Sequence, residues 1–317
     1  SLEHLPTGLD GSRYQSLDLD GEGLPGVLTE QGTGWYYKRN VSPLLDPAGG
    51  AGGSAAARFS PAQLVSHKPS VAALGTRGQL FLDLAGDGQV DLVEFRAGLS
   101  GYQERIQDRD DWEGFVAFSS IPNIHVDDPN VRFIDLTGDG HADLVLSGDG
   151  SFTWFPSLAE AGFGDGRRVQ QALDEEKGPR LVFADGTESI HLADLSGDGL
   201  TDLVRIRNGE VCYWPNAGYG RFGAKVTMDG APWFDAPDLF DQQRVRLGDI
   251  DGSGTTDIFY LGREKITIWR NESGNRWSAP IRLTEFPRTD TLSTVTVLDL
   301  LGNGTACLVW SSPLPGE

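Results

Sequence analysis

Six copies of an Asp-Gly motif constrain this chain more than any other feature. They read DLDGEGLPGVL at 18–28, DLAGDGQVDLV at 83–93, DLTGDGHADLV at 135–145, DLSGDGLTDLV at 194–204, DIDGSGTTDIF at 249–259 and DLLGNGTACLV at 299–309. The first Asp residues are 65, 52, 59, 55 and 50 residues apart. These intervals exceed leucine-rich and ankyrin periods and are close to the length of a four-stranded propeller blade.

The residues around each motif indicate four β-strands per unit. In the fourth unit a strand over 202–206 leaves the turn, Asn208-Gly209 signals a hairpin, and 210–214 alternates like a third strand. An aromatic residue follows the ninth motif position by 11 or 12 residues in five units, as Tyr37, Tyr102, Trp154, Trp214 and Trp269. A short polar turn and another aromatic segment then suggest a fourth strand.

The expected fold class is therefore all-β, a six-bladed β-propeller of four-stranded blades in one domain over residues 1–317. The alternative is an ordinary β-sandwich with chance Asp-Gly turns. Residues 46–57 are of low complexity and predict a loop, and residues 103–130 form an acidic insertion. The sixth unit stops soon after its second strand, so its blade is expected to be incomplete or closed by the N-terminal segment or by chain beyond residue 317.

The motif has the form D-x-[DNST]-x-D-G-x-x-D, which can gather oxygen ligands for a hard cation. Calcium takes six to eight oxygens, and glycine at position six permits the tight turn. The third and fourth copies keep every oxygen-bearing position, so the predicted Ca²⁺ ligands are Asp135, Thr137, Asp139, Asp143, Asp194, Ser196, Asp198 and Asp202. The alternative is that the Asp side chains cap the turns without metal, in which case no cofactor is required.

Charge and composition exclude several functions. The formal net charge of −20 disfavours nucleic acid as a partner. No apolar run approaches the 18 residues of a membrane span. The chain begins at Ser1 without Met or a signal peptide, which suggests a segment of a longer protein.

Catalytic motifs are missing, which favours a protein that is not an enzyme. The five histidines are scattered, and neither H-E-x-x-H, G-x-S-x-G nor a P-loop occurs. G-x-G-x-x-G occurs at 21–26 and 218–223, but both copies lie inside the β repeat and open no helix.

The turns resemble FG-GAP/VCBS repeats, and longer stretches resemble the middle region of the B component of Tc (toxin complex) insecticidal toxins. These stretches are LPTGLDGS at 5–12, LDLDGEGLPGVLTEQ at 17–31, GWYYKRN at 34–40, YWPNAGYGRFG at 213–223, FDAPDLF at 234–240 and NGTACLVWS at 303–311. The resemblance runs nearly end to end.

In that family the region forms a propeller beside an RHS-repeat cocoon that encloses a toxic segment. The resemblance implies that the propeller docks on the funnel of the pore-forming A component and rearranges to let the cargo pass. It also implies a secreted or extracellular toxin assembly. We expect closure between the degenerate first and sixth units to be the labile seam.

Two alternatives to docking and gating stay open. A carbohydrate-binding propeller would stack sugars on exposed aromatics such as Trp35, Trp112 or Trp233. A hydrolase or lyase would need a cluster of polar residues in a central channel, which the sequence does not show.

Overall fold

The computed structural model describes residues 14–42, 57–65, 68–69, 72–76, 78–96, 98–106, 110–286 and 295–310. Its regular structure is almost entirely β, with two short 3₁₀ helices, η3 (Ala159–Ala161) and η4 (Gln242–Arg244). The chain divides into two compact units, one over 1–119 with 293–317 and the other over 120–292. The predicted loop at 46–57 lies outside the described residues except for the buried Ala57.

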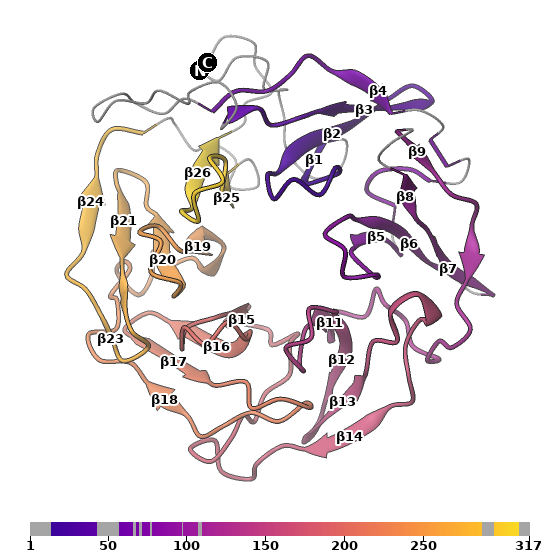
Figure 1. Cartoon of the computed structure of the whole chain (residues 1–317). Helices are drawn as coiled ribbons and strands as arrows, with labels where there is room; N and C mark the ends of the chain where they lie inside the picture. The colour runs from indigo at the N-terminus through magenta and orange to yellow at the C-terminus, as the bar shows by residue number, and fades with distance from the viewer. Residues whose placement is uncertain are drawn as a thin grey trace. The chain divides into compact units, whose positions relative to one another are not determined.

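The first unit holds two four-stranded antiparallel sheets and one hairpin (Figure 1). The strands of sheet one follow the order β1 (Tyr14–Leu17), β2 (Gly26–Gln31), β3 (Gly34–Lys38), β4 (Gln63–Val65). Sheet two has the order β10 (Val116–Ala117), β7 (Leu99–Gln103), β6 (Asp91–Arg96), β5 (Gln79–Leu82). The hairpin pairs β25 (Val295–Leu298) with β26 (Cys307–Trp310). A smaller pair, β8 (Arg105–Ile106) and β9 (Asp111–Trp112), lies between β7 and β10 in sequence.

The second unit holds three further four-stranded antiparallel sheets. Sheet three is β11 (Val131–Ile134), β12 (Asp143–Gly148), β13 (Ser151–Phe155), β14 (Arg167–Gln170). Sheet four is β15 (Ile190–Ala193), β16 (Asp202–Arg207), β17 (Glu210–Trp214), β18 (Val226–Thr227). Sheet five is β19 (Val245–Gly248), β20 (Asp257–Leu261), β21 (Ile266–Trp269), β24 (Ile281–Leu283). The pair β22 (Asn271–Glu272) and β23 (Arg276–Trp277) leads from β21 toward β24.

Each Asp-Gly motif joins the first strand of a sheet to the second, as the sequence predicts. In sheet four, Ala193 pairs with Asp202 across turn 194–201, and Arg207 pairs with Glu210 across Asn208-Gly209. Gly209 has φ +83°, the left-handed conformation that this hairpin turn requires. Four-stranded antiparallel meanders of this kind are propeller blades, so the all-β propeller class is confirmed.

The predicted number of six blades is wrong: the described residues form five four-stranded sheets. The sixth motif lies in the two-stranded pair β25–β26. Only residues 311–317 follow β26 in this sequence, and they lie outside the described residues. Strand β1 pairs with β2, and residues 1–13 of the N-terminal segment that was expected to close this blade lie outside the described residues.

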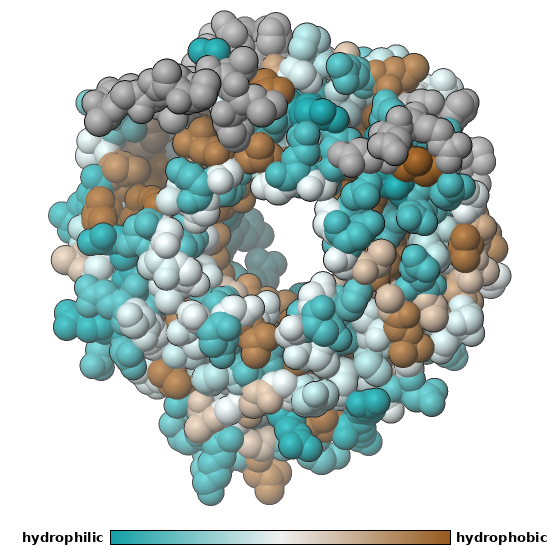
Figure 2. Space-filling model, viewed as in Figure 1, coloured by the Kyte–Doolittle hydropathy of each residue, from teal (hydrophilic) through white to brown (hydrophobic). Residues whose placement is uncertain are grey.

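The cores lie between successive sheets within each unit. The five aromatic residues that follow the motifs at a fixed offset are all buried, with exposed fractions of 0–7%. In the second unit, Trp154 and Trp214 pack with Leu136 and Leu203 in one cluster of sheets three and four. The face of the molecule that Figure 2 shows is mostly hydrophilic, with smaller hydrophobic areas. The third-strand aromatics are therefore core residues that fill the space between blades.

We expect Leu203→Ala to lower the free energy of unfolding by about 2–5 kcal/mol, because Leu203 is fully buried and its removal leaves a cavity. Leu173→Ala is the matched control in the same unit, since Leu173 is 89% exposed, and a change within about 0.5 kcal/mol is expected. Urea unfolding of both variants measures the difference. Equal midpoints for the two variants would contradict the packing described here.

Candidate functional site

The carboxylate of the first Asp of each turn accepts hydrogen bonds from backbone N–H groups of that turn. Asp135 accepts hydrogen bonds from the backbone N–H of Gly138 and Gly140 at 2.7 and 2.9 Å, and from Thr137 at 3.0 Å. Burial acts to raise the pKa of Asp135, but the backbone N–H donors hold it below its ordinary value. The first Asp of the other five motifs accepts from the glycine at position six in the same way. All six turns therefore share one internal hydrogen-bond pattern.

The Asp at position nine is buried and joins the turn to the end of the third strand. Asp202 is 0% exposed and accepts from Leu195 N at 3.0 Å and from Asn216 N at 2.9 Å. Asp143 and Asp257 accept from the equivalent backbone groups in turns three and five. Burial raises the pKa of all three carboxyl groups, and their backbone N–H donors, which for Asp202 also include Ser196 N, oppose that rise.

Turn one replaces this carboxylate with a phenol. Position nine is Gly26, and a Cβ there would lie 2.3 Å from the Tyr37 hydroxyl oxygen. That hydroxyl accepts from Leu19 N at 3.3 Å, the backbone group at position two that the carboxylate binds in other turns. It also donates to Leu17 O at 3.2 Å. The glycine therefore makes room for Tyr37, which takes over the role of the missing Asp.

The residue at position 23, counted from the first Asp, links four of the five sheets to the turn of a neighbouring sheet or pair. Asn271 of sheet five donates to Leu195 O in turn four at 2.9 Å. Asn216 of sheet four donates to Asp135 O in turn three at 3.5 Å. In the first unit, Asn40 donates to Leu300 O at 2.9 Å, and Arg105 lies 3.8 Å from Asp20. The same structural position therefore connects sheets in both units.

Position three carries a carboxylate in two turns, and an arginine faces it in both. Asp20 accepts from Arg39 Nε at 2.9 Å and Nη2 at 2.6 Å. Asp251 lies 3.5 Å from Arg270. Both arginines occupy position 22 of their repeat. Turns three and four have an uncharged hydroxyl residue at position three, and in these repeats position 22 is proline. A guanidinium therefore compensates the extra carboxylate within the chain itself.

The structure brings the eight predicted calcium ligands into two compact turns, where the six carboxylates accept internal hydrogen bonds and the two hydroxyl groups donate them. Asp139 and Asp198 are exposed and accept from the backbone N–H two residues on, at 2.9 Å. Thr137 and Ser196 donate to the first Asp at 3.4 and 3.3 Å. The described carboxylates that cluster within 4.8 Å of one another are Asp249, Asp251 and Asp257 of turn five. Calcium in turns three and four stays a prediction.

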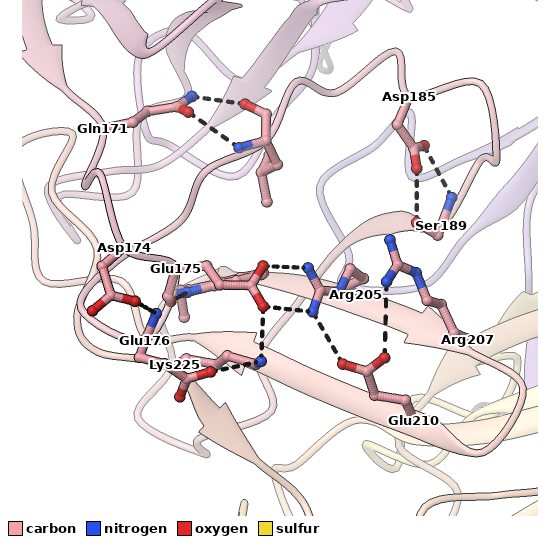
Figure 3. Close-up of polar contacts among 12 residues, drawn as sticks. Gln171, Asp174, Glu175, Glu176, Asp185, Ser189, Arg205, Arg207, Glu210 and Lys225 are labelled. Carbon is pink, nitrogen blue, oxygen red and sulfur yellow. Dashed lines mark hydrogen bonds and ion pairs between the residues drawn. The ribbon is translucent and has the colours of Figure 1, made fainter.

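An ion-pair cluster holds the connection between sheets three and four (Figure 3). Glu175 accepts from Arg205 at 2.9 Å and from Lys225 at 3.1 Å, and Arg205 also binds Glu210 at 3.0 Å. Hydrogen bonds from Arg205 and Lys225 lower the pKa of Glu175 to about 2. The backbone O of Glu175 accepts from Trp214 Nε1 at 2.8 Å. This loop is therefore fastened to sheet four by both charge and backbone contacts.

The aromatic residues proposed for sugar stacking differ sharply in exposure. Trp35 is 0% and Trp112 8% exposed, so both are core residues and the stacking hypothesis is wrong for them. Their rings pack edge to face at 6.2 Å. Trp233 is 71% exposed and is available for contact.

Sequence reasoning missed the position-23 residues and the role of Tyr37. A signal was present, because Asn40, Asn216 and Asn271 stand at the same distance from their motifs. Tyr37 was counted among the phased aromatics, but its hydroxyl could be paired with Gly26 only once the turn geometry was known.

Comparisons with known proteins agree with the repeat. A family model described as FG-GAP-like repeat matches residues 135–205 and 249–310. Curated protein sequences gave no significant match. Among the described residues, no helix has the length and apolar character of a membrane span.

Solved structures match nearly the whole chain. The Photorhabdus luminescens Tc holotoxin pore is 32% identical with a TM-score of 0.77, covering 94% of this chain and 13% of that chain. A crystal structure of TcdB2-TccC3-Cdc42 is 30% identical with a TM-score of 0.53, and the match covers 98% of this chain and 14% of that chain. An Agrocybe aegerita lectin that recognises non-reducing terminal N-acetylglucosamine is 19% identical with a TM-score of 0.56, covering 95% and 72%, which shows the fold alone.

Repeats and sheets together define a β-propeller built from FG-GAP-like repeats. The chain is a propeller region of the Tc toxin B-component type. It spans 13% and 14% of the length of the first two Tc toxin structures that it matches.

We expect Asp91 to make the first unit less stable as pH rises. Burial raises the pKa of Asp91 to about 7, and Glu104, Asp87 and Asp83 add to the rise, while one backbone N–H, from Leu84, opposes it. The folded pKa exceeds the unfolded value of about 3.9. This contribution is therefore fully present below about pH 4 and is lost as pH rises through about 7.

Urea midpoints at about pH 5 and about pH 8, on either side of the Asp91 pKa, measure this effect. The wild-type chain should lose more stability between the two pH values than Asp91→Asn, which cannot ionise. Asp87→Asn, at an exposed position in the same turn, controls for the change in net charge. A wild-type loss no larger than that of Asp91→Asn would show that Asp91 does not titrate in this range.

Proposed function

We propose that this chain is the docking and gating module of a Tc toxin B component and is not an enzyme. It would bind the funnel of the pore-forming A component and control the passage of cargo from an RHS-repeat cocoon in the parent protein. The similarity to the Tc holotoxin pore over 94% of the chain carries this proposal. The assembly would act outside the producing cell, as part of a toxin complex.

The relatives themselves support a region with more than one arrangement. The holotoxin pore and the TcdB2-TccC3-Cdc42 crystal are 32% and 30% identical to this chain, but their TM-scores are 0.77 and 0.53. The two relatives therefore match the arrangement of this chain to different degrees, although their identities to it are similar. A gating module needs such alternative arrangements.

Contacts inside the first unit suggest where a gate could open. Sheet one and the pair β25–β26 share a small core, whose five buried members among the described residues include Val27 and Leu300. The core of sheets four and five has twelve buried members among the described residues. Asn40 is 1% exposed and supplies the hydrogen bond to Leu300 O, 260 positions away in sequence. Among the described residues this contact has fewer buried apolar side chains, so we expect it to open at lower free-energy cost.

Hydrogen exchange of the full chain, alone and with a Tc A component, tests docking and gating together. We expect slower exchange in exposed loops on mixing, because docking excludes water from them. We also expect β25–β26 to exchange faster than β19–β21 in the free chain and to change most on mixing.

Two matched variants locate the gate. Asn40→Ala should speed exchange in β25–β26 without affecting sheet five, whereas Asn216→Ala removes an equivalent contact and should act only on turn three and sheet four. No change on mixing would refute docking. Docking with equal changes in all sheets would refute the gate at β25–β26 and leave docking in place.

A further inference from the structure

A groove in the second unit combines an exposed tryptophan with two cations. It has a volume of about 260 Å³ and lies between the 230–234 connection and the outer strands β21 and β24. Trp233, Lys265 and Arg282 line it together with Thr267, Ser278 and Pro280. Within the described part of the chain, no hydrogen bond or ion pair that joins turns or sheets uses the side chains of Trp233, Lys265 or Arg282.

The β16–β17 turn holds the connection that carries Trp233 in place. Gly209 N donates to Pro232 O, and Asn208 Oδ1 accepts from Phe234 N, both at 2.8 Å. A Cβ on Gly209 would lie 2.8 Å from the indole of Trp233, so the ring rests on the bare glycine of the β16–β17 turn. Phe234 is 7% exposed and stacks on Phe240 at 5.5 Å. Trp233 is therefore exposed on a preorganised loop, which reduces the entropy cost of binding.

The two cations lie on one side of the groove. Arg282 is the β-sheet partner of Thr267, and Lys265 stands two residues before Thr267, so both project to the same face of sheet five. Among the described residues, neither receives an ion pair or a side-chain hydrogen bond, although the chain carries a net charge of −20. Unpaired cations beside an apolar ring favour a ligand with an anionic group next to an apolar face.

We propose that this groove binds an acidic sugar unit, a pyranose ring that carries a carboxylate. The apolar C–H face of the ring lies on Trp233, and the carboxylate takes charge-assisted hydrogen bonds from Arg282 and Lys265. The groove is smaller than the 300–1,000 Å³ typical of drug-sized ligands, so it suits a single ring at the end of a glycan. A neutral sugar would leave both cations without a partner.

An acidic peptide is the competing occupant, and the shape of the groove disfavours it. An extended peptide would pair along the free edge of β24, which spans only Ile281–Leu283. The cations and Trp233 instead converge on one short groove. The observations therefore favour a compact ring over an extended chain.

Acrylamide quenching of tryptophan fluorescence can report binding in the intact chain. Of the eight tryptophans, Trp233 is the exposed one, and the others are buried or half-buried. We expect methyl glucuronide to protect this fluorescence from quenching, with a Kd of about 1 mM because one ring and one ion pair bury little surface. Methyl glucoside should bind at least about tenfold more weakly, since it cannot pair with the cations.

Variants separate the two halves of the site. Ligand-observed NMR, which does not depend on tryptophan, should show about tenfold weaker glucuronide binding for Trp233→Ala and for Arg282→Gln. Arg263→Gln, at another exposed arginine of the second unit that lies outside the groove, should bind as the wild type does. Trp233→Phe should retain most of the binding, and unchanged urea midpoints would show that all variants fold.

Several results would overturn this proposal. One is the absence of glucuronide binding at about 20 mM, well above the expected Kd. Equal binding of glucoside and glucuronide, or equal effects of Arg282→Gln and Arg263→Gln, would show that the cations do not bind the carboxylate. Tighter binding of a glutamate oligomer than of glucuronide would favour the peptide. The proposal does not rest on docking to an A component, and hydrogen exchange with that component reports docking separately.

Discussion

The buried aspartate at position nine is the contact on which blades two to five depend, and Tyr37 takes its place in blade one. Asp202 accepts two backbone N–H groups from its own turn, those of Leu195 and Ser196, and a third from Asn216 at the end of the third strand. Because Asn216 also reaches the turn of the neighbouring sheet, one carboxylate fixes the geometry of a turn, a sheet and a connection between sheets. Burying a carboxylate is costly unless it is hydrogen-bonded, and these three donors meet that requirement.

This arrangement separates structural chemistry from binding chemistry. The carboxylates of the Asp-Gly turns accept internal hydrogen bonds, and arginines compensate the extra charge of Asp20 and Asp251. The groove proposed to bind a ligand is a separate site, lined by Trp233 and two cations in the second unit. The contact of Asn40 with Leu300 belongs to the first unit and bears on gating. Docking, gating and ligand binding can therefore be tested with separate residues.

Much of the fold could be predicted because the repeat encodes it locally. Asp-Gly turns, the Asn208-Gly209 hairpin and the phased aromatics each specify a strand boundary or a core position, and the structure agrees with them. The number of blades could not be predicted in this way, because the motif specifies two strands and not the outer pair. The exposure of Trp233 and the burial of Trp35 depend on packing between sheets, which residue type alone does not determine.

The most direct test compares Asp202→Asn with Asp198→Asn in the full chain, by urea unfolding and by hydrogen exchange of the Asn216 amide. Asp202→Asn should cost about 1–3 kcal/mol and speed that exchange, because an amide NH₂ would then face backbone donors. Asp198 is exposed and binds only Leu200 N, so Asp198→Asn should change stability within about 0.5 kcal/mol. If the Asp198 variant lost as much stability as the Asp202 variant, buried hydrogen bonding at position nine could not be what holds the blade together.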